Sequence, residues 1–399
     1  MLLNMILSDI HAGRSVLVID PKADLVNDVL ARIPDSRRDD VVVLDPSSSA
    51  PVGFNPLSFR GFRDKTLLAD AILAAFREIF SDTFGIRSQD YFSAALLTLA
   101  DMKGSNLLWL PPLLTDEHFR GKIVAQVKDE VALKPFWQQY EAMKESERRT
   151  QVETVLNKLR QLLFRPGLRN VLGQSKPKFD FADLFYERKI VLVPLNKSLI
   201  GAESARLLGS LIIGMTWTLA LARADIPKEK RHIINVYIDE LQDYLALPTD
   251  LADALAQARG LGVGITMAHQ YRSQLTSQLK AGIDANARNK ICFGLSGPDA
   301  KEMAAQASEL TAQDFMNLPR YSIYANVQYH GRSTGWMMGK TLPPPPELRL
   351  PADLKAYSDQ RYGVPAEETE AAYLKLLRAN SHTDSDTQKP EPLIGRKPI

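Results

Sequence analysis

Two adjacent carboxylates, Asp239 and Glu240, follow an apolar run in the second half of the chain. Residues 233–238 before them (Ile-Ile-Asn-Val-Tyr-Ile) are mostly apolar and partly β-branched, which is typical of a buried parallel strand. In open α/β sheets, ligands bind at the carboxyl ends of the strands. An apolar strand that ends in Asp-Glu is the pattern of a Walker B element, in which the Asp holds a metal ion on nucleotide phosphates and the Glu polarises the attacking water. The alternative is a strand whose acidic end is simply solvated.

Other polar side chains lie where they could join the same site. Asp20 and Lys22 follow a predicted strand at residues 15–19, and Gln270 follows one at residues 263–268. A primary amide such as that of Gln270 can donate to a phosphate oxygen and accept from a water. Arg259 precedes Gln270 by eleven residues, at the end of a predicted helix. The alternatives are a polar strand end for Gln270 and a cation that interacts with the helix dipole for Arg259.

The composition is that of a soluble globular protein. The chain has 399 residues, 45% of them hydrophobic and 24% charged, which is enough for two or three domains. Its net charge of +2 neither requires nor excludes nucleic acid, because a local basic surface can exist within a neutral total. Cys292 is the only cysteine, which excludes a disulfide framework and a multi-cysteine metal site and fits a reducing cytoplasm.

The longest uncharged apolar run is residues 207–222. Its sixteen residues fall short of the roughly 20 that span a bilayer. We therefore predict a buried core helix there, and no membrane span in this chain.

Strands and helices alternate on both sides of a long helical region. A strand at residues 15–19, a helix to about residue 33 and a strand at residues 41–44 form a βαβ unit, which favours a parallel sheet. Amphipathic helices fill residues 62–173, and their many Arg and Lys side chains form either a solvated face or a surface for DNA or a partner. The later part of the chain predicts strands at residues 190–193, 233–238, 263–268 and 290–295, a helix at 271–279, and an antiparallel pair at 321–329 and 334–339.

These elements predict four regions. We expect the first part of an α/β core, an all-helical insertion, the second part of the core, and a short helix with a disordered tail, at residues 1–61, 62–178, 179–345 and 346–399. The four prolines at residues 343–346 are expected to end the fold.

Five segments keep an order and spacing that a known family shares. They are Val18 to Leu25, Tyr237 to Glu240, Ala258 to Gly262, Ala268 to Gln270 and Asn286 to Asp299. Together they resemble the conjugative coupling proteins of type IV secretion and the wider HerA–FtsK group of hexameric DNA-pumping ATPases. The resemblance covers roughly residues 1–342. It implies a RecA-like α/β fold of the P-loop NTPase class, with a mostly parallel sheet, an all-helical insertion, and ATP and Mg²⁺ as cofactors.

The resemblance also assigns roles. Asp239 would help to hold Mg²⁺ through water, and Glu240 would act as general base or orient the water. Gln270 would sense the γ-phosphate and couple hydrolysis to movement. Arg259 occupies the place of an arginine finger for the ATP of the neighbouring subunit, since a planar guanidinium suits the phosphate charge of the transition state. The remaining candidates for the nucleotide site or the subunit interface are Asp20, Lys22 and Arg288.

The partners that the resemblance implies are DNA, held mainly through its phosphates in the channel of a homo-hexamer, and secretion-machine or relaxosome proteins. The implied location is the cytoplasm or the inner face of the bacterial membrane.

One part of this fold is absent from the sequence. The 399 residues contain no Gly-x-x-x-x-Gly-Lys-Ser/Thr loop, whose backbone N–H groups would cradle phosphates. The segment Leu2 to Ile6 resembles the helix that follows such a loop. We therefore expect an N-terminally truncated chain that lacks the P-loop and an interior strand of the sheet, and that hydrolyses ATP negligibly alone. A P-loop encoded in frame upstream of Met1 would establish this.

Two other functions compete with a DNA motor. The missing P-loop favours a non-hydrolysing scaffold or recruitment protein, whereas the residue types at Glu240, Gln270 and Arg259 disfavour it. An ATPase that feeds proteins into a secretion machine is the third hypothesis. DNA binding that weakens with salt separates the DNA motor from this protein motor.

Overall fold

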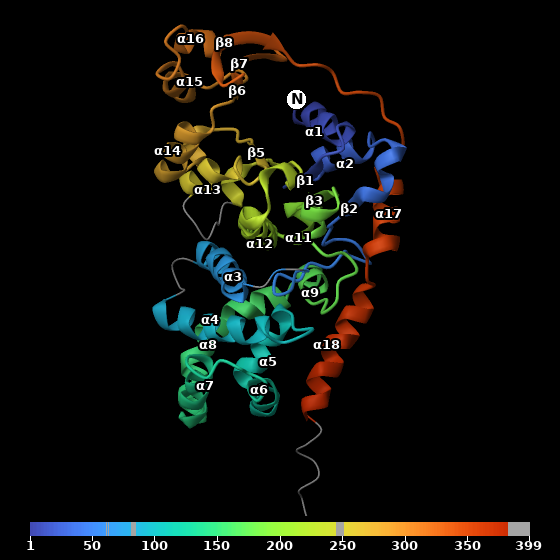
Figure 1. The fold of residues 1–399 in the computed structure, drawn as a ribbon, viewed down its shortest axis with the longest axis vertical. Coiled ribbons are helices and arrows are strands. Elements are labelled where there is room, and N and C mark those ends of the chain that lie inside the picture. Colours follow the sequence, from blue (N-terminus) through green and yellow to red (C-terminus); the bar gives the residue numbers. More distant parts are fainter. Residues whose placement is uncertain (61, 63, 81–84, 245–250, 382–399) are drawn as a thin grey trace, which may run out of the picture.

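A parallel sheet lies at the centre of an elongated molecule (Figure 1). The computed structural model describes residues 1–60, 62, 64–80, 85–244 and 251–381. Five strands pair in parallel in the order β2-β3-β1-β4-β5. Their bounds are Val41–Val43, Ile190–Pro194, Ser15–Asp20, Ile234–Ile238 and Val263–Met267. Together with the helical insertion, this sheet confirms the predicted α/β fold class.

Helices cover both faces of this sheet. α1 (Leu2–His11) and α2 (Asp24–Leu30) pack on one face, where Val16 and Val18 of β1 are fully buried. α12 (Ala202–Leu221) packs on the opposite face, against Leu17 and Ile19. By length and hydropathy α12 could cross a membrane, but 89% of its most apolar stretch is buried inside the protein. The prediction of a core helix is confirmed.

The insertion is entirely helical in the described residues. Its helices extend the hydrophobic core that begins at α12, because α3 packs against α12 and α4 packs against α3. They are α3 (Lys65–Ile79), α4 (Ile86–Ala100), α5 (Leu110–Thr115), α6 (Glu117–Val124), α7 (Leu133–Ala142), α8 (Glu145–Leu163) and α9 (Pro166–Leu172). The domain boundaries stay a prediction, since this one core is shared by sheet and insertion.

The core between the insertion and the second sheet contains shorter helices. They are α10 (Asp183–Tyr186), α11 (Lys197–Ile200), α13 (Leu251–Ala258) and α14 (Ser277–Asn286). The helix predicted at residues 271–279 is wrong: a single 3-10 turn at Arg272–Gln274 comes first. The hydroxyl of Thr276 then accepts a hydrogen bond from the backbone N–H of Leu279, which fixes the start of α14.

A second sheet of three antiparallel strands follows α14. β6 (Lys290–Cys292), β7 (Ser322–Tyr329) and β8 (Arg332–Lys340) pair in that order, which confirms the predicted hairpin. α15 (Gly297–Ala304) and α16 (Ala312–Met316) cover one face of this sheet around Phe315. β6 is shorter than the strand predicted at residues 290–295.

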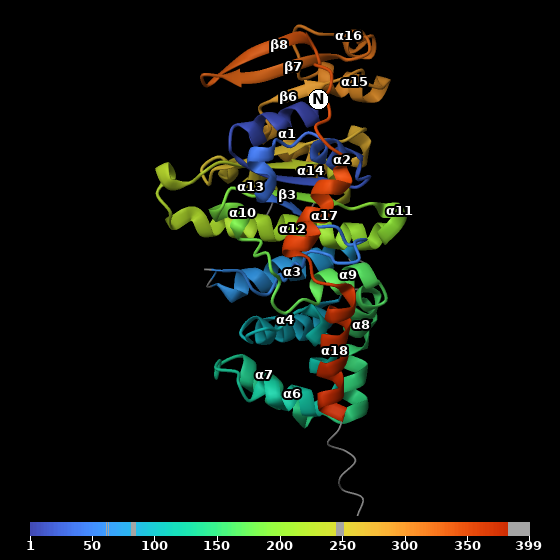
Figure 2. The ribbon, with the colours of Figure 1, turned by 90° about the vertical axis from the view of Figure 1, so that its right-hand side faces the viewer.

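The prolines at residues 343–346 do not end the fold, contrary to expectation. The chain returns as α17 (Pro351–Tyr362) and α18 (Ala366–Ser381), which lie beside the sheet and the insertion (Figures 1 and 2). α17 shows little helical periodicity in the sequence because it buries only Leu354, Ser358 and Tyr362. The end of the predicted disordered tail, residues 382–399, lies outside the described residues.

The two edges of the parallel sheet differ. At the β2 edge, the backbone N–H of Val43 donates to the hydroxyl of Ser358 in α17, 2.8 Å away. At the β5 edge, no described residue pairs with the outer side of the strand. The backbone groups of Val263, Ile265 and Met267 face this edge, because the alternate residues bond to β4.

Candidate active site

The carboxyl ends of β1, β4 and β5 lie next to one another. The register pairs Ile19 with Ile238, and Ile238 with Met267. Asp20, Asp239 and the segment that leads to Gln270 therefore all leave the sheet at the carboxyl ends of its strands. Open α/β sheets bind their ligands at these strand ends.

Glu240 is the centre of this cluster. Its side chain is buried, and its carboxylate accepts hydrogen bonds from the amides of Gln270 and of Gln242, the latter at 2.9 Å. The ammonium of Lys22 lies 3.6 Å from the same carboxylate. Burial opposes ionisation, but the two amides and the Lys22 charge outweigh it and lower the pKa of Glu240. Glu240 is thus held as an ionised acceptor.

The neighbouring carboxyl, Asp239, has the opposite shift. Burial raises its pKa first, and the negative charges of Glu240 and Asp20 raise it further. Two adjacent carboxyls whose pKa values move apart are typical of sites that assign them different tasks. A cation that bound beside Asp239 would relieve the repulsion.

Asp20 makes backbone contacts that the sequence did not predict, and its role at the nucleotide site stays a prediction. It is buried, and its two carboxylate oxygens accept from the backbone N–H groups of Lys22 at 2.9 Å and Val26 at 3.0 Å. Asp20 therefore shapes the turn into α2. It reaches the site through its charge rather than through an open coordination position.

Gln242 belongs to the site, but sequence reasoning missed it. Its amide nitrogen holds Glu240, whereas its oxygen is buried with no hydrogen-bond partner among the described residues. A buried amide oxygen without a partner is costly and fits a site that takes a water or a ligand. The only available signal was its spacing, two residues after Glu240.

The donor set fits Mg²⁺ only as part of a larger ligand sphere. In the part of the chain that the structure describes, no group of three or more His, Cys, Asp or Glu side chains could hold a metal ion. Mg²⁺ commonly keeps several waters and takes one or two carboxylates together with substrate phosphates. Asp239 and the free oxygen of Gln242 suit that arrangement, while no phosphate-binding loop is present in the sequence.

The two other predicted arginines lie away from this cluster. Arg259 is exposed at the end of α13, and its carbonyl accepts from Gly262 at the amino end of β5, the opposite end from Gln270. Arg288 is exposed just before β6. The roles predicted for Arg259 and Arg288, at the nucleotide site or a subunit interface, stay predictions.

Part of the positive charge of the insertion is neutralised by ion pairs. Arg148 lies 2.6 Å from Glu141 and 3.6 Å from Glu117, and Arg149 lies 2.5 Å from Glu145. Arg169 forms an ion pair with Glu370 of α18. These contacts favour the solvated, internally paired face over a nucleic-acid surface.

Known structures share the fold of this chain. No protein-family model matches the sequence, and no curated protein matches it. The plasmid coupling protein TrwB in complex with ADP and Mg²⁺ superposes with a TM-score of 0.60 at 16% identity, over 88% of this chain and 84% of that one. The chain has the fold of TrwB. Unbound TrwB superposes with a TM-score of 0.57 at 16% identity, over 84% of this chain and 79% of that one.

VirB4 of Thermoanaerobacter pseudethanolicus has the same fold at a greater distance. Its TM-score is 0.51 at 14% identity, over 84% of each chain. The predicted resemblance to type IV secretion ATPases is therefore confirmed at the level of the fold.

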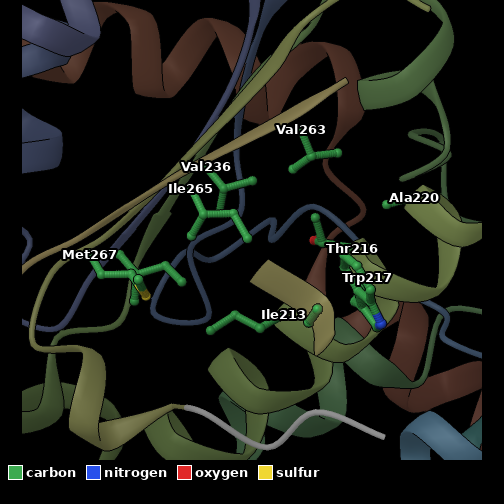
Figure 3. A pocket seen from close by; sticks show the side chains of 10 residues that line it. Ile213, Thr216, Trp217, Ala220, Val236, Val263, Ile265 and Met267 are labelled. Carbon is green, nitrogen blue, oxygen red and sulfur yellow. The ribbon is translucent and has the colours of Figure 1, made fainter. Parts of the chain in front are cut away.

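An apolar hollow lies between α12 and the sheet in this TrwB-like fold (Figure 3). Val263, Ile265 and Met267 of β5 line it from one side, and Ile213 and Trp217 of α12 line it from the other. It contains none of the predicted site residues, and its lining does not suit a nucleotide.

Proposed function

We propose that this chain is the ATPase core of a type IV secretion motor that transfers DNA in conjugation. The observation that carries the proposal is the Glu240 cluster, with Gln270, Gln242 and Lys22 around one ionised carboxylate at the carboxyl edge of a TrwB-like sheet. TrwB itself has been solved with ADP and Mg²⁺ and with a non-hydrolysable ATP analogue. We infer that ATP and Mg²⁺ are the cofactors here too.

Each residue of the cluster has a task in this proposal. Asp239 holds Mg²⁺ through water, and the ion, when bound, neutralises the phosphate charge that develops in the transition state. Glu240 accepts a proton from the attacking water or orients it. Gln270 already contacts Glu240, so its amide can exchange that contact for a phosphate oxygen and move β5 when the phosphate leaves.

The wider assembly follows from the same proposal. Arg259, beside the amino end of β5 and so at the opposite end of that strand from Gln270, would reach the nucleotide of the next subunit in a homo-hexamer. DNA would pass through the channel of that hexamer, beside secretion-machine or relaxosome proteins. The motor would work in the cytoplasm or at the inner face of the bacterial membrane.

ATP hydrolysis tests the proposal in two protein forms. The 399-residue chain, which contains no P-loop, is expected to hydrolyse ATP negligibly. A fusion that places the P-loop strand and loop of TrwB before Met1 is expected to hydrolyse ATP faster when DNA is added. In the fusion, Glu240→Gln should lower the rate about 10²- to 10⁴-fold, because the water loses its base.

Arg259→Ala in the fusion should lower the rate by about 10³-fold or more if it acts as an arginine finger. Arg149→Ala is the matched control, because that exposed arginine is paired within the insertion. Rates like those of the unsubstituted fusion in both Glu240→Gln and Arg259→Ala would overturn the site assignment. A robust rate for the 399-residue chain would contradict its need for a P-loop.

The absence of a P-loop favours one alternative, a scaffold that recruits partners without hydrolysis. A fusion that folds and binds no ATP would support this alternative. A fusion that hydrolyses ATP with no response to DNA would instead favour a motor for proteins.

A further inference from the structure

The second sheet contains a hairpin with positive charge and no negative charge. Residues 315–346, which include β7 and β8, contain no Asp or Glu. Their cations are Arg320, Arg332 and Lys340. All three side chains belong to exposed residues. In a chain with a net charge of only +2, this is a local concentration of charge of one sign.

These cations lack carboxylate partners, unlike several of the arginines of the insertion. In the described part of the chain, no ion pair involves Arg320, Arg332 or Lys340, whereas Arg148, Arg149 and Arg169 are all paired. Unpaired cations leave the local potential unscreened and attract phosphates. The hairpin is therefore a basic surface without compensating acidic side chains of its own.

Exposed aromatic rings accompany the cations at both ends of the hairpin. At its base, the guanidinium of Arg320 stacks over the ring of Tyr321 at 4.8 Å, and Tyr321 is 59% exposed. At its tip, Tyr329 pairs directly with Arg332 across the strands and is 69% exposed. The strand rise places the Cα atoms of the two tyrosines about 27 Å apart.

The turn between the strands fixes the pair at the tip. His330 and Gly331 both have positive φ, 47° and 78°, which is the two-residue turn that matches the twist of a hairpin. Figure 2 shows the tip of the hairpin extending beyond the helices α15 and α16 that cover its base. Tyr329 and Arg332 at the tip are thus open to a large ligand.

We propose that the β7–β8 hairpin is a binding surface for single-stranded DNA, in which Tyr321 and Tyr329 stack on bases and the three cations hold the phosphates. Exposed aromatic rings beside cations are the usual means of binding single strands without reading their sequence. The assignment rests on the proposed function, which supplies DNA as the partner, and it names the surface that takes it. The absence of acidic side chains over the whole hairpin argues against a basic or neutral peptide as the occupant.

Fluorescence anisotropy of a labelled single-stranded oligonucleotide over a series of salt concentrations tests the charges. We expect the 399-residue chain to bind, and the triple variant Arg320→Gln/Arg332→Gln/Lys340→Gln to bind at least tenfold more weakly at low salt. The salt slope should decrease by about 2, since each phosphate contact of a single strand contributes roughly 0.7. The matched control, Lys144→Gln/Arg149→Gln/Arg160→Gln in the insertion, removes the same charge and should leave the slope unchanged.

The double variant Tyr321→Leu/Tyr329→Leu tests stacking separately from charge. We expect roughly tenfold weaker binding or more, with the salt slope preserved, because the phosphate contacts remain. Tyr186→Leu, a tyrosine 47% exposed in α10, is the control. Circular dichroism and the fluorescence of Trp336, which packs on Phe315 beneath the hairpin, report whether each variant keeps the second sheet folded.

No binding by the unsubstituted chain would overturn the inference, as would equal binding by the hairpin and control variants. Loss of binding in the charge variant alone would overturn the role of the two rings. These measurements need no ATP, so they are separate from the test of the proposed function. A fusion whose hydrolysis responds to DNA while its hairpin variants bind DNA normally would refute only the hairpin assignment.

Discussion

Gln270, after β5, donates its side-chain amide to the carboxylate of Glu240, after β4. Glu240 holds this position with a left-handed backbone, at φ 52°, which is costly for a residue other than glycine. A strained backbone conformation persists only where the surrounding contacts hold it in place, and such residues are frequent at functional sites. The contact links the two strand ends through one ionised group, so that a change at Gln270 alters the electrostatics of Glu240.

The paired carboxyls give a prediction for stability. Asp239→Asn should raise the free energy of unfolding at pH 7 by about 0.5–2 kcal/mol, because it removes a half-buried charge that Glu240 and Asp20 repel. A raised folded pKa destabilises the native state above that pKa, and the penalty disappears below the unfolded pKa of about 3.9. The gain should therefore vanish as the pH falls below about 4.

Urea unfolding followed by circular dichroism at neutral and acidic pH measures this difference. Asp253→Asn, at an exposed position in α13, is the control and should change stability by less than about 0.5 kcal/mol. Destabilisation by Asp239→Asn at pH 7 would show that the favourable interactions of its carboxylate with the backbone N–H of Glu240 and the charge of Lys22 outweigh the repulsion.

Arg272 anchors the segment after Gln270, and its removal should be costly. Its buried guanidinium lies 2.6 Å from Asp284 and 2.7 Å from Glu302. Arg272→Gln should lower the free energy of unfolding by about 2 kcal/mol, less than a fully buried pair would lose because both carboxylates keep some solvent contact. Lys280→Gln, 3.4 Å from Glu302 but more exposed, should cost under about 0.5 kcal/mol.

The carboxylates of Asp284 and Glu302 also predict how the stability of the protein changes at acidic pH. Burial alone would raise the pKa of Asp284, but the hydrogen bonds and charge of Arg272 lower it, and the hydrogen bond from Arg272 lowers the pKa of Glu302. Lowered folded pKa values add stability above the unfolded values of about 4, and this stability is lost as the pH falls through the folded values. Between pH 6 and pH 2, the free energy of unfolding should fall less steeply with decreasing pH in Arg272→Gln than in the unsubstituted chain. An unchanged slope would mean that Arg272 does not set these pKa values.

The sequence was most informative where buried strands end in the polar residues of the site. Parallel strands buried on both faces read as apolar runs, so the polar residues at their carboxyl ends stand out, and Glu240 and Gln270 do meet. Asp20 was placed correctly at that edge, but its bonds to backbone N–H groups depend on the path of the turn into α2. No residue pattern reveals that path in advance.

Other parts of the fold depend on contacts between distant segments. Gln242 enters the site only because the chain turns back after Glu240, and α17 forms because it buries three side chains against a strand some 300 residues earlier. Its short apolar stripe gives a weak periodic signal, and the prolines before it are typical of a linker. Tertiary burial outweighs both signals.

The free edge of β5 predicts a local pattern of hydrogen exchange. The amides of Val263, Ile265 and Met267 face outward with no described partner, whereas those of β1 are bonded within the sheet on both sides. Exchange measured by NMR should be much faster at these three positions than in β1, and faster than at Gly264 and Thr266, whose amides face β4. Equal protection along β5 would show that another segment covers this edge in solution.

The opposite edge gives a prediction about the returning helix. Ser358 is fully buried in α17, and its hydroxyl accepts from the backbone N–H of Val43 at 2.8 Å. Ser358→Ala leaves that N–H buried without a partner, so the free energy of unfolding should fall by about 1–3 kcal/mol. Ser146→Ala, at an exposed position of α8, should change it by less than about 0.5 kcal/mol. If urea unfolding shows no difference between the two variants, α17 does not close the β2 edge, and the prolines at residues 343–346 end the stable fold after all.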